Sequence, residues 1–158
     1  MSFVLAIIMA AVFLAADQIT KYIVMTNMEL GQSIDFIDGL LDFTYIHNDG
    51  GAWGMLGGSR WFLIGFTAVI MVVLVILLIK NGRKNKLFFW AGTLIVSGGI
   101  GNMIDRIFRG GEVVDFLHAT FINFPIFNIA DCAVVIGAGL LILYFVLDMK
   151  NDIKKEKE

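Results

Sequence analysis

Residues 61–79 read WFLIGFTAVIMVVLVILLI, a run of mostly apolar residues without a single charge. A helix that crosses the hydrocarbon core of a membrane needs about 20 residues of this kind. Outward from this run, similar stretches lie at about 3–25, 87–104 and 126–147. The chain is 58% hydrophobic and 16% charged, whereas soluble domains are about 25% charged. These features predict an all-α membrane protein, a bundle of four transmembrane helices.

The first stretch could also be an N-terminal targeting segment. Residues 3–16 end in Leu14-Ala15-Ala16 and have the length of the apolar part of a secretory signal peptide. No basic residue precedes them, and the apolar pattern resumes after Lys21. We therefore expect a retained first span and a single membrane domain over residues 1–158.

The charges of the connecting loops predict the orientation. Cytoplasmic loops of membrane proteins carry an excess of Lys and Arg. Loop 80–86 and the tail 148–158 are rich in these residues, whereas loop 26–60 holds five acids and one base. We expect loop 80–86, the tail and both termini in the cytoplasm, and the loops 26–60 and 105–125 outside.

The first outer loop has the pattern of a small sheet. Apolar residues alternate at Ile34 and Phe36 and again over 41–45, and the turn signal Asp38-Gly39 lies between the two segments. Residues 113–117 of the second outer loop can add a strand. The rest of the first loop is rich in glycine, and we expect it to act as a short closing lid. These glycines are Gly50, Gly51, Gly54, Gly57 and Gly58.

Polar residues gather at the outer ends of three spans. A charge inside a span is costly, so each one suggests a function. The residues concerned are Asp17, Lys21, Asn102, Asp105, Arg106, Asn128 and Asp131. At a rise of ~1.5 Å per residue, Asp17 and Asp131 lie roughly 8 to 12 Å below the outer boundary. A functional site just below the outer leaflet is therefore predicted.

Nucleophilic catalysis by a side chain lacks its usual partners. Ser97 is the only serine within a span, and Lys21, a candidate base on another helix, has Asp17 four residues before it as a counter-charge. Cys132 directly follows Asp131, so we expect it to point to a different face of the helix as a small apolar residue.

Metal chemistry and nucleic acid binding are also disfavoured. The two histidines, His47 and His118, lie in outer loops and form no zinc-binding motif. No basic stripe runs along the chain. We expect no metal, no cofactor and no nucleic acid partner.

Acids remain as the source of chemistry. Two neighbouring carboxyl groups share one proton, so one can activate water while the other donates a hydrogen bond to a peptide carbonyl. Asp131 has no basic residue within a helical turn, and its partner must come from another segment. Asp17, Asp42, Asp105 and Asp115 all qualify on spacing, and the residues alone do not choose among them.

Two other functions compete with a peptidase. Acids within membranes relay protons in ion-coupled carriers, but here the polar residues stop at one leaflet and no internal repeat is seen. A scaffold whose acids only brace the helices is the third hypothesis.

Five sequence blocks, in order, resemble those of the bacterial lipoprotein signal peptidases, also called signal peptidase II. They are Asp-Gln-Ile-Thr-Lys at 17–21, Asn-Asp-Gly-Gly-Ala-Trp-Gly at 48–54, Gly-Gly-Ile-Gly-Asn-Met-Ile-Asp-Arg at 98–106, Val-Val-Asp-Phe at 113–116 and Phe-Asn-Ile-Ala-Asp at 127–131. Together the blocks span nearly the whole chain.

This resemblance implies site residues that the pattern alone could not assign. The two catalytic aspartates of the family correspond to Asp115 and Asp131. Supporting or substrate-binding roles fall to Asp17, Lys21, Asn48, Gly98, Asn102, Arg106 and Asn128.

The resemblance also implies a function and a location. Members have four spans in the bacterial cytoplasmic (inner) membrane, both termini in the cytoplasm, and an outer β-rich element with a mobile helical segment over the site. They are aspartic endopeptidases that cut prolipoproteins just before a cysteine carrying a diacylglyceryl group, and globomycin blocks them. We expect a monomer whose partners are lipid-modified prolipoproteins and membrane lipids.

Three positions depart from the family pattern. His47 stands where the family usually has Arg, and Gly51 where it usually has Ala. The stretch between Arg106 and Asp115 is also one residue longer than in some members, at Gly110-Gly111. These differences affect loops and leave both aspartates in place.

Overall fold

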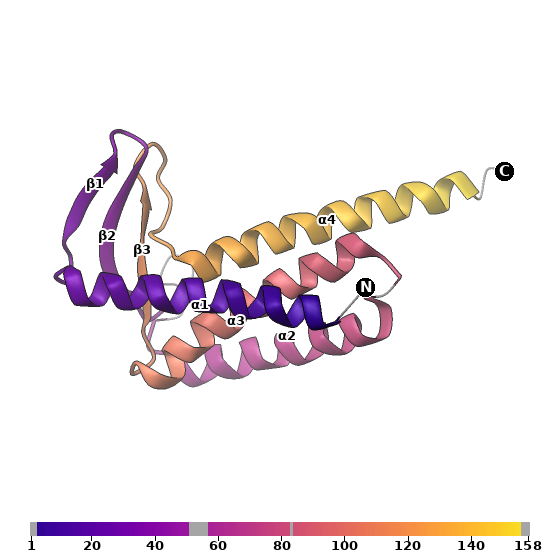
Figure 1. Ribbon diagram of the computed structural model, residues 1–158, viewed down its shortest axis with the longest axis horizontal. Coiled ribbons are helices and arrows are strands. Elements are labelled where there is room, and N and C mark those ends of the chain that lie inside the picture. Colours follow the sequence, from indigo (N-terminus) through magenta and orange to yellow (C-terminus); the bar gives the residue numbers. More distant parts are fainter. Residues whose placement is uncertain (1–2, 51–56, 83, 156–158) are drawn as a thin grey trace.

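The structure is a computed structural model, and it describes residues 3–50, 57–82 and 84–155. Within these residues it has four long helices and a three-stranded sheet (Figure 1). In chain order the elements are α1 (Phe3–Asn27), β1 (Ser33–Ile37), β2 (Leu41–Asn48), α2 (Arg60–Asn81), α3 (Lys86–Phe108), β3 (Val113–Ala119) and α4 (Ile129–Lys155). All four of these helices are long and apolar enough to cross a membrane. The predicted four-helix bundle with a small sheet is confirmed.

The sheet is antiparallel, with the strand order β1-β2-β3. The turn at Asp38-Gly39 joins β1 to β2, and Gly39 has a φ of 66°, which glycine adopts without strain. The pairing of β2 with β3 places Asp115 opposite Ile46, and it brings the second outer loop against the first. Figure 1 shows the sheet at one end of the bundle, beside the end of α1 and the start of α4.

Helix α3 lies at the centre of the bundle. It packs against α1, α2 and α4, and it is the most buried of the four helices. Glycines allow this close approach, as is common between membrane helices. A Cβ atom at Gly92 would lie 2.8 Å from the side chain of Leu78, and one at Gly99 would lie 2.6 Å from that of Met71. Both contacts are with α2.

Gly98 lies at a tight contact between α3 and α4. A Cβ atom there would collide with the carbonyl oxygen of Ala130 and with the side chain of Val134. We expect Gly98→Ala to lower the free energy of unfolding by about 1–3 kcal/mol, the usual cost of overpacking. Unfolding by denaturant in detergent micelles measures this change.

The control is Gly139→Ala in α4, because a Cβ atom at Gly139 would meet nothing within 4 Å. Alanine is also a better helix former than glycine. Gly139→Ala should therefore leave the stability unchanged or slightly raised. Equal stability of the two variants would show that the contact at Gly98 is not tight.

Helix α4 differs from the predicted span at both ends. It begins at Ile129 rather than at residue 126, because Phe127 forms an isolated β-bridge with Leu117 and stays extended. It continues to Lys155, so most of the expected tail is helical, and in Figure 1 this end projects beyond the other helices. The predicted lid falls largely on residues 51–56, including Gly51 and Gly54, which lie outside the described residues.

Candidate active site

The start of α4 fixes the position of Asp131. Asn128 precedes the helix, and its Oδ1 accepts a hydrogen bond from the backbone N–H of Asp131 (2.9 Å). In return, Oδ2 of Asp131 accepts one from the backbone N–H of Asn128 (3.1 Å). This reciprocal arrangement is a capping box, which satisfies N–H groups that a helix start leaves unpaired. The cap holds the two residues together at the start of the helix.

Asn102 of α3 links α4 to α1. Its Nδ2 donates a hydrogen bond to Oδ1 of Asp131 (2.7 Å). Its Oδ1 accepts hydrogen bonds from Nζ of Lys21 and from Nδ2 of Asn128, both at 3.0 Å. Because two donors occupy the oxygen of the amide, its nitrogen is directed to Asp131.

Asp115 lies within strand β3, in the segment of the second outer loop for which the sequence suggested a strand. Its Oδ1 accepts a hydrogen bond from Nδ2 of Asn128 (2.6 Å), and its Oδ2 accepts one from Nδ2 of Asn48 at the end of β2 (2.8 Å). Asn128 therefore binds Asp115 through its side-chain amide and Asp131 through the helix cap. The two carboxyl groups are connected through one residue.

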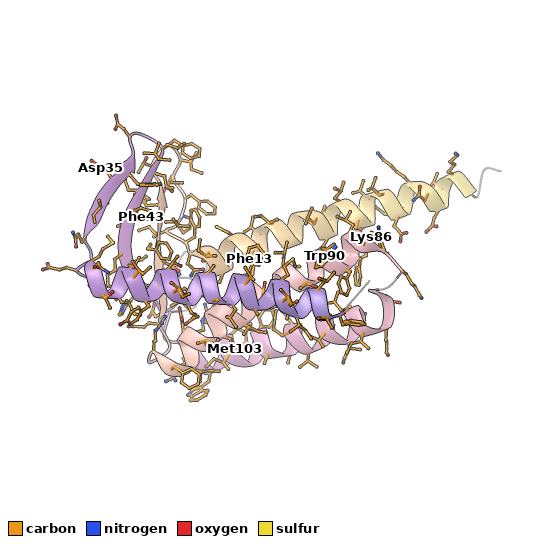
Figure 2. The ribbon with its side chains drawn as sticks, in the orientation of Figure 1. Phe13, Asp35, Phe43, Lys86, Trp90 and Met103 are labelled. Carbon is orange, nitrogen blue, oxygen red and sulfur yellow. The ribbon has the colours of Figure 1, made fainter. Side chains whose placement is uncertain are left out.

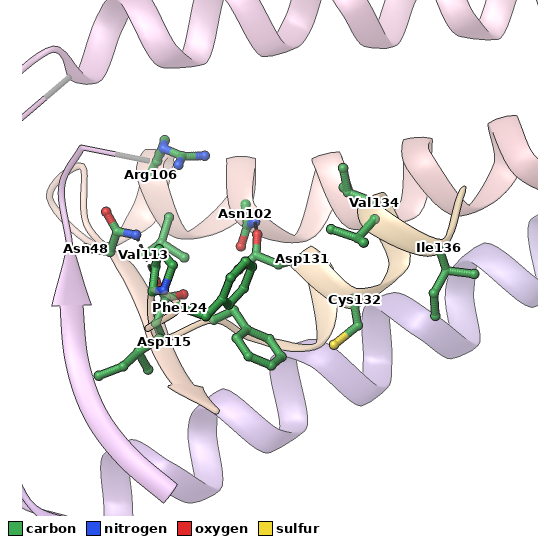
Figure 3. A pocket seen from close by; sticks show the side chains of 14 residues that line it. Asn48, Asn102, Arg106, Val113, Asp115, Phe124, Asp131, Cys132, Val134 and Ile136 are labelled. Carbon is green, nitrogen blue, oxygen red and sulfur yellow. Dashed lines mark hydrogen bonds between the residues drawn. The ribbon is translucent and has the colours of Figure 1, made fainter. Parts of the chain in front are cut away.

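Asp115 and Asp131 line the same pocket, which has a volume of about 520 Å³. In Figure 3, Asp115 enters it from the strand and Asp131 from the helix. The other polar side chains in its wall are Asn48, Asn102 and Arg106. The rest of the wall is mostly apolar, and it is formed by residues 124–127 and by one side of α4.

The environment of Asp115 changes its acidity. Burial raises the pKa of Asp115 to about 7, and the nearby charge of Asp131 adds to the rise. The hydrogen bonds from Asn48 and Asn128 act in the opposite direction, because they favour the ionised form. A carboxyl group with this pKa exchanges its proton near neutral pH, which suits general acid–base catalysis.

Lys21 is at the centre of a separate buried ion cluster. Its side chain is fully buried, and Nζ lies 3.0 Å from Oδ2 of Asp17 and 2.8 Å from Oδ2 of Asp105. The predicted pairing of Asp17 with Lys21 is present. Oδ1 of Asp17 also accepts the backbone N–H of Ala130, which ties α1 to the start of α4 (3.0 Å).

These contacts distinguish the four candidate partners of Asp131. Asp17 and Asp105 are both bound to Lys21, and Asp42 lies in β2, opposite Asp35, outside the pocket. Asp115 is the candidate that shares the pocket with Asp131.

Two residues of the ion cluster were missed in the sequence. Nε2 of Gln18 donates to Oδ1 of Asp105 (3.1 Å), and Nη1 of Arg109 donates to the same atom (2.6 Å). The spacing of four between Asp105 and Arg109 is a signal that could have suggested their pairing. Besides its neighbour Asp17, the partners of Gln18 are more than 80 residues away in the sequence, so nothing local identifies it.

Arg106 contributes the positive charge of the pocket. Its side chain is mostly buried, and Nε has no hydrogen-bond partner among the described residues. It lies in the wall of the pocket that also holds Asp115 and Asp131. A buried donor that has no partner among the described residues needs an explanation, such as a bound ligand.

Cys132 also lines the pocket, so the expectation that it faces elsewhere was wrong. The pocket extends along α4 from Asp131 to Ile136 and therefore includes the neighbouring position (Figure 3). No group of three or more potential metal ligands is found in the described part of the chain.

His47, one departure from the family pattern, has partners outside the pocket. Its Nε2 lies 2.7 Å from the hydroxyl oxygen of Tyr45, and its Nδ1 lies 2.6 Å from Oε2 of Glu112. These contacts join the end of β2 to the start of β3, next to Asn48.

The fold and the pocket together define a polytopic membrane protein with one buried and one half-buried carboxyl group, Asp115 and Asp131, beside a mostly apolar cavity. The sequence matches the family described as signal peptidase (SPase) II over residues 9–147. The chain belongs to this family, and it is therefore a peptidase with several membrane-spanning helices.

Individual relatives agree with the family match. The chain is 46% identical to the lipoprotein signal peptidase of Brevibacillus brevis over 145 residues, which is 92% of this chain and 97% of that one. It is 40% identical to the lipoprotein signal peptidase of Enterococcus faecalis over 143 residues, 90% of this chain and 88% of that one. A solved structure described as a bacterial membrane enzyme has a TM-score of 0.87 and 38% identity, and it covers 92% of this chain and 90% of its own.

Proposed function

We propose that the chain is an aspartic endopeptidase that removes the signal peptide from diacylglyceryl-modified prolipoproteins, cutting just before the lipidated cysteine. The observation that carries this proposal is the pair Asp115 and Asp131, which line one pocket from different elements and are joined through Asn128. The name lipoprotein signal peptidase, given to the relatives, supports the substrate class.

The pair works with one proton between its two carboxyl groups. The ionised group takes a proton from a water molecule, and the water oxygen attacks the carbonyl carbon of the peptide. The protonated group donates its hydrogen to the carbonyl oxygen and stabilises the tetrahedral intermediate. A proton then passes to the leaving nitrogen as the C–N bond breaks. The pKa of about 7 favours Asp115 as the protonated partner near neutral pH. Water is a sufficient nucleophile, so the reaction requires no metal or cofactor.

The other residues implied by the family have distinct roles in this proposal. Arg106, whose Nε has no hydrogen-bond partner among the described residues, binds carbonyl groups of the substrate through its guanidinium group. Asn48, Asn102 and Asn128 orient the two carboxyl groups. Asp17 and Lys21 act as positioning residues through Asn102 and the start of α4. Gly98 allows α3 and α4 to approach.

The shape of the pocket fits a substrate that arrives within the membrane. Val135 and Ile136 line the pocket, and both are also exposed on the surface of α4. The surface of a membrane-spanning helix faces lipid, so the pocket reaches the bilayer on this side. A signal peptide is apolar, and it can enter sideways. We place the pocket near the outer leaflet, with both termini in the cytoplasm.

Reconstituted cleavage tests the proposal. The purified chain is mixed in micelles with a precursor whose cysteine carries a diacylglyceryl group, and with a matched precursor whose cysteine is replaced by serine. We expect the modified precursor to be cut on the N-terminal side of its cysteine, as seen by mass spectrometry, and a globomycin-type inhibitor to block the cut. An intact modified precursor, or equal cutting of both precursors, would refute the proposed specificity.

The rate should depend on pH through Asp115. The folded pKa is raised, so Asp115 holds its proton below about 7 and loses it as the pH rises through that value. Well above this pH the protonated fraction of Asp115 falls about tenfold per pH unit. The rate falls with it, because a doubly ionised pair cannot donate to the carbonyl oxygen. Values of kcat/KM over a pH series measure this decline, because they report the pKa values of the free enzyme. A rate that stays constant well above pH 7 is incompatible with this role of Asp115.

A further inference from the structure

The connection between β3 and α4 exposes large apolar side chains. We call residues 120–126 the outer hook. Phe121, Ile122 and Phe124 of this hook are 60%, 49% and 41% exposed, and Leu40 in the adjacent turn is 45% exposed. The chain carries no charge between residues 119 and 130. A connection that faces water is usually polar, so the outer hook is unlike a solvated loop.

Backbone hydrogen bonds hold the outer hook at both ends. Thr120 donates its N–H to the carbonyl oxygen of Leu40 (3.1 Å). Phe127 and Leu117 exchange two hydrogen bonds, of 3.0 and 2.8 Å. A groove of about 340 Å³ lies between the hook and the sheet, and the described residues that line it are all apolar. The apolar side chains of the hook are thus presented by a fixed backbone.

The position of the outer hook indicates what covers these side chains. Phe124 lies five residues before Ile129, the first residue of the membrane-spanning helix α4. Even a fully extended chain of that length reaches at most roughly 18 Å. Figure 1 shows the hook between the sheet and the start of α4, on the side of the sheet that faces the helices. The hook is therefore close to the membrane boundary.

The face of the sheet turned away from the apolar groove is polar. The sheet and the outer hook together therefore have one polar and one apolar side. Ser33 and Thr44 are joined through their hydroxyl groups (2.8 Å), and Thr44 also contacts Nδ1 of His118 (3.4 Å). Asp35 of β1 and Asp42 of β2 lie opposite each other in the same pair of strands. An element with one polar and one apolar side is typical of proteins that lie at a membrane interface.

We propose that the outer hook is an interfacial anchor, which inserts Phe121, Ile122 and Phe124 among the acyl chains of the leaflet around the start of α4. The groove beside it takes up lipid hydrocarbon. Phe124 and Phe127 line both this groove and the pocket of Asp115 and Asp131. The anchor thereby sets the depth at which the pocket meets the bilayer.

Fluorescence quenching in vesicles tests the anchor. Cys132 is the chain's one cysteine, so Phe121→Cys and Ile122→Cys are made separately in a Cys132→Ser background. Asp35→Cys is the matched control, because Asp35 lies at the outer edge of the same sheet (Figure 2). Each full-length variant carries an environment-sensitive label in phosphatidylcholine vesicles. Nitroxide groups on the lipid acyl chains or iodide in the water serve as quenchers.

We expect the lipid nitroxide to quench both hook labels several-fold more than the control label, and iodide to show the reverse order. Quenching of the hook labels by iodide as strongly as the control would mean that the hook faces water. Hook labels shielded from both quenchers would mean that protein, such as a second copy of the chain, covers them. Either result overturns the anchor. Two hook positions guard against one variant that misfolds, and the readout does not depend on peptidase activity.

Discussion

Replacing Asp115 or Asp131 by asparagine is expected to lower the rate of precursor cleavage by roughly a thousandfold, within the range that a positioned acid or base contributes. Asparagine has nearly the same size as aspartate, so the pocket remains filled. It can neither take a proton from water nor hold one for the carbonyl oxygen. Single-turnover rates with a diacylglyceryl-modified precursor measure the chemical step directly.

Asp42→Asn is the matched control for this experiment. Asp42 also follows two apolar residues and precedes a phenylalanine, but it lies in β2, outside the pocket. Its replacement should leave the rate within about twofold, since surface substitutions rarely disturb a remote site. If Asp115→Asn or Asp131→Asn retains a near-normal rate while still folding, the acid pair does not carry the reaction.

The contrast between Asp42 and Asp115 shows why the sequence could not identify the second acid. The two residues have the same local pattern, and what separates them is the pairing of β2 with β3. This pairing places Val113 opposite Asn48, and it brings Asp115 within reach of the Asn48 amide. Such pairing joins segments about 65 residues apart, and no local periodicity encodes it. Only the family resemblance singled out Asp115.

Asp131 was easier to find, because a charge within an apolar span is unusual in itself. The existence of the four helices was predictable for a similar reason, since long apolar runs have few alternatives. The residues at which the helices begin and end were harder to predict. The start of α4 depends on the cap by Asn128 and on the bridge of Phe127 to Leu117, and both need partners that only the folded chain supplies.

Replacing Lys21 by methionine is expected to lower the free energy of unfolding by about 3–5 kcal/mol, the usual cost of removing one partner from a buried ion pair. The three hydrogens of Nζ are directed to Asp17, Asp105 and Asn102. Methionine has a similar length but no charge, so Asp17 loses its cation. Asn102 also loses the donor that orients its amide. Denaturant unfolding in mixed micelles measures the loss.

A double variant separates loss of charge balance from loss of packing. Asparagine at position 17 keeps an oxygen that can accept the N–H of Ala130, but it carries no charge. Lys21→Met combined with Asp17→Asn should therefore be more stable than Lys21→Met alone by about 1 kcal/mol or more, because residues in one buried network do not act additively. Lys80→Met, at the exposed end of α2, serves as the control and should leave stability unchanged. If the double variant is less stable than the single one, the carboxylate of Asp17 stabilises the protein without Lys21, through contacts such as the hydrogen bond from the N–H of Ala130.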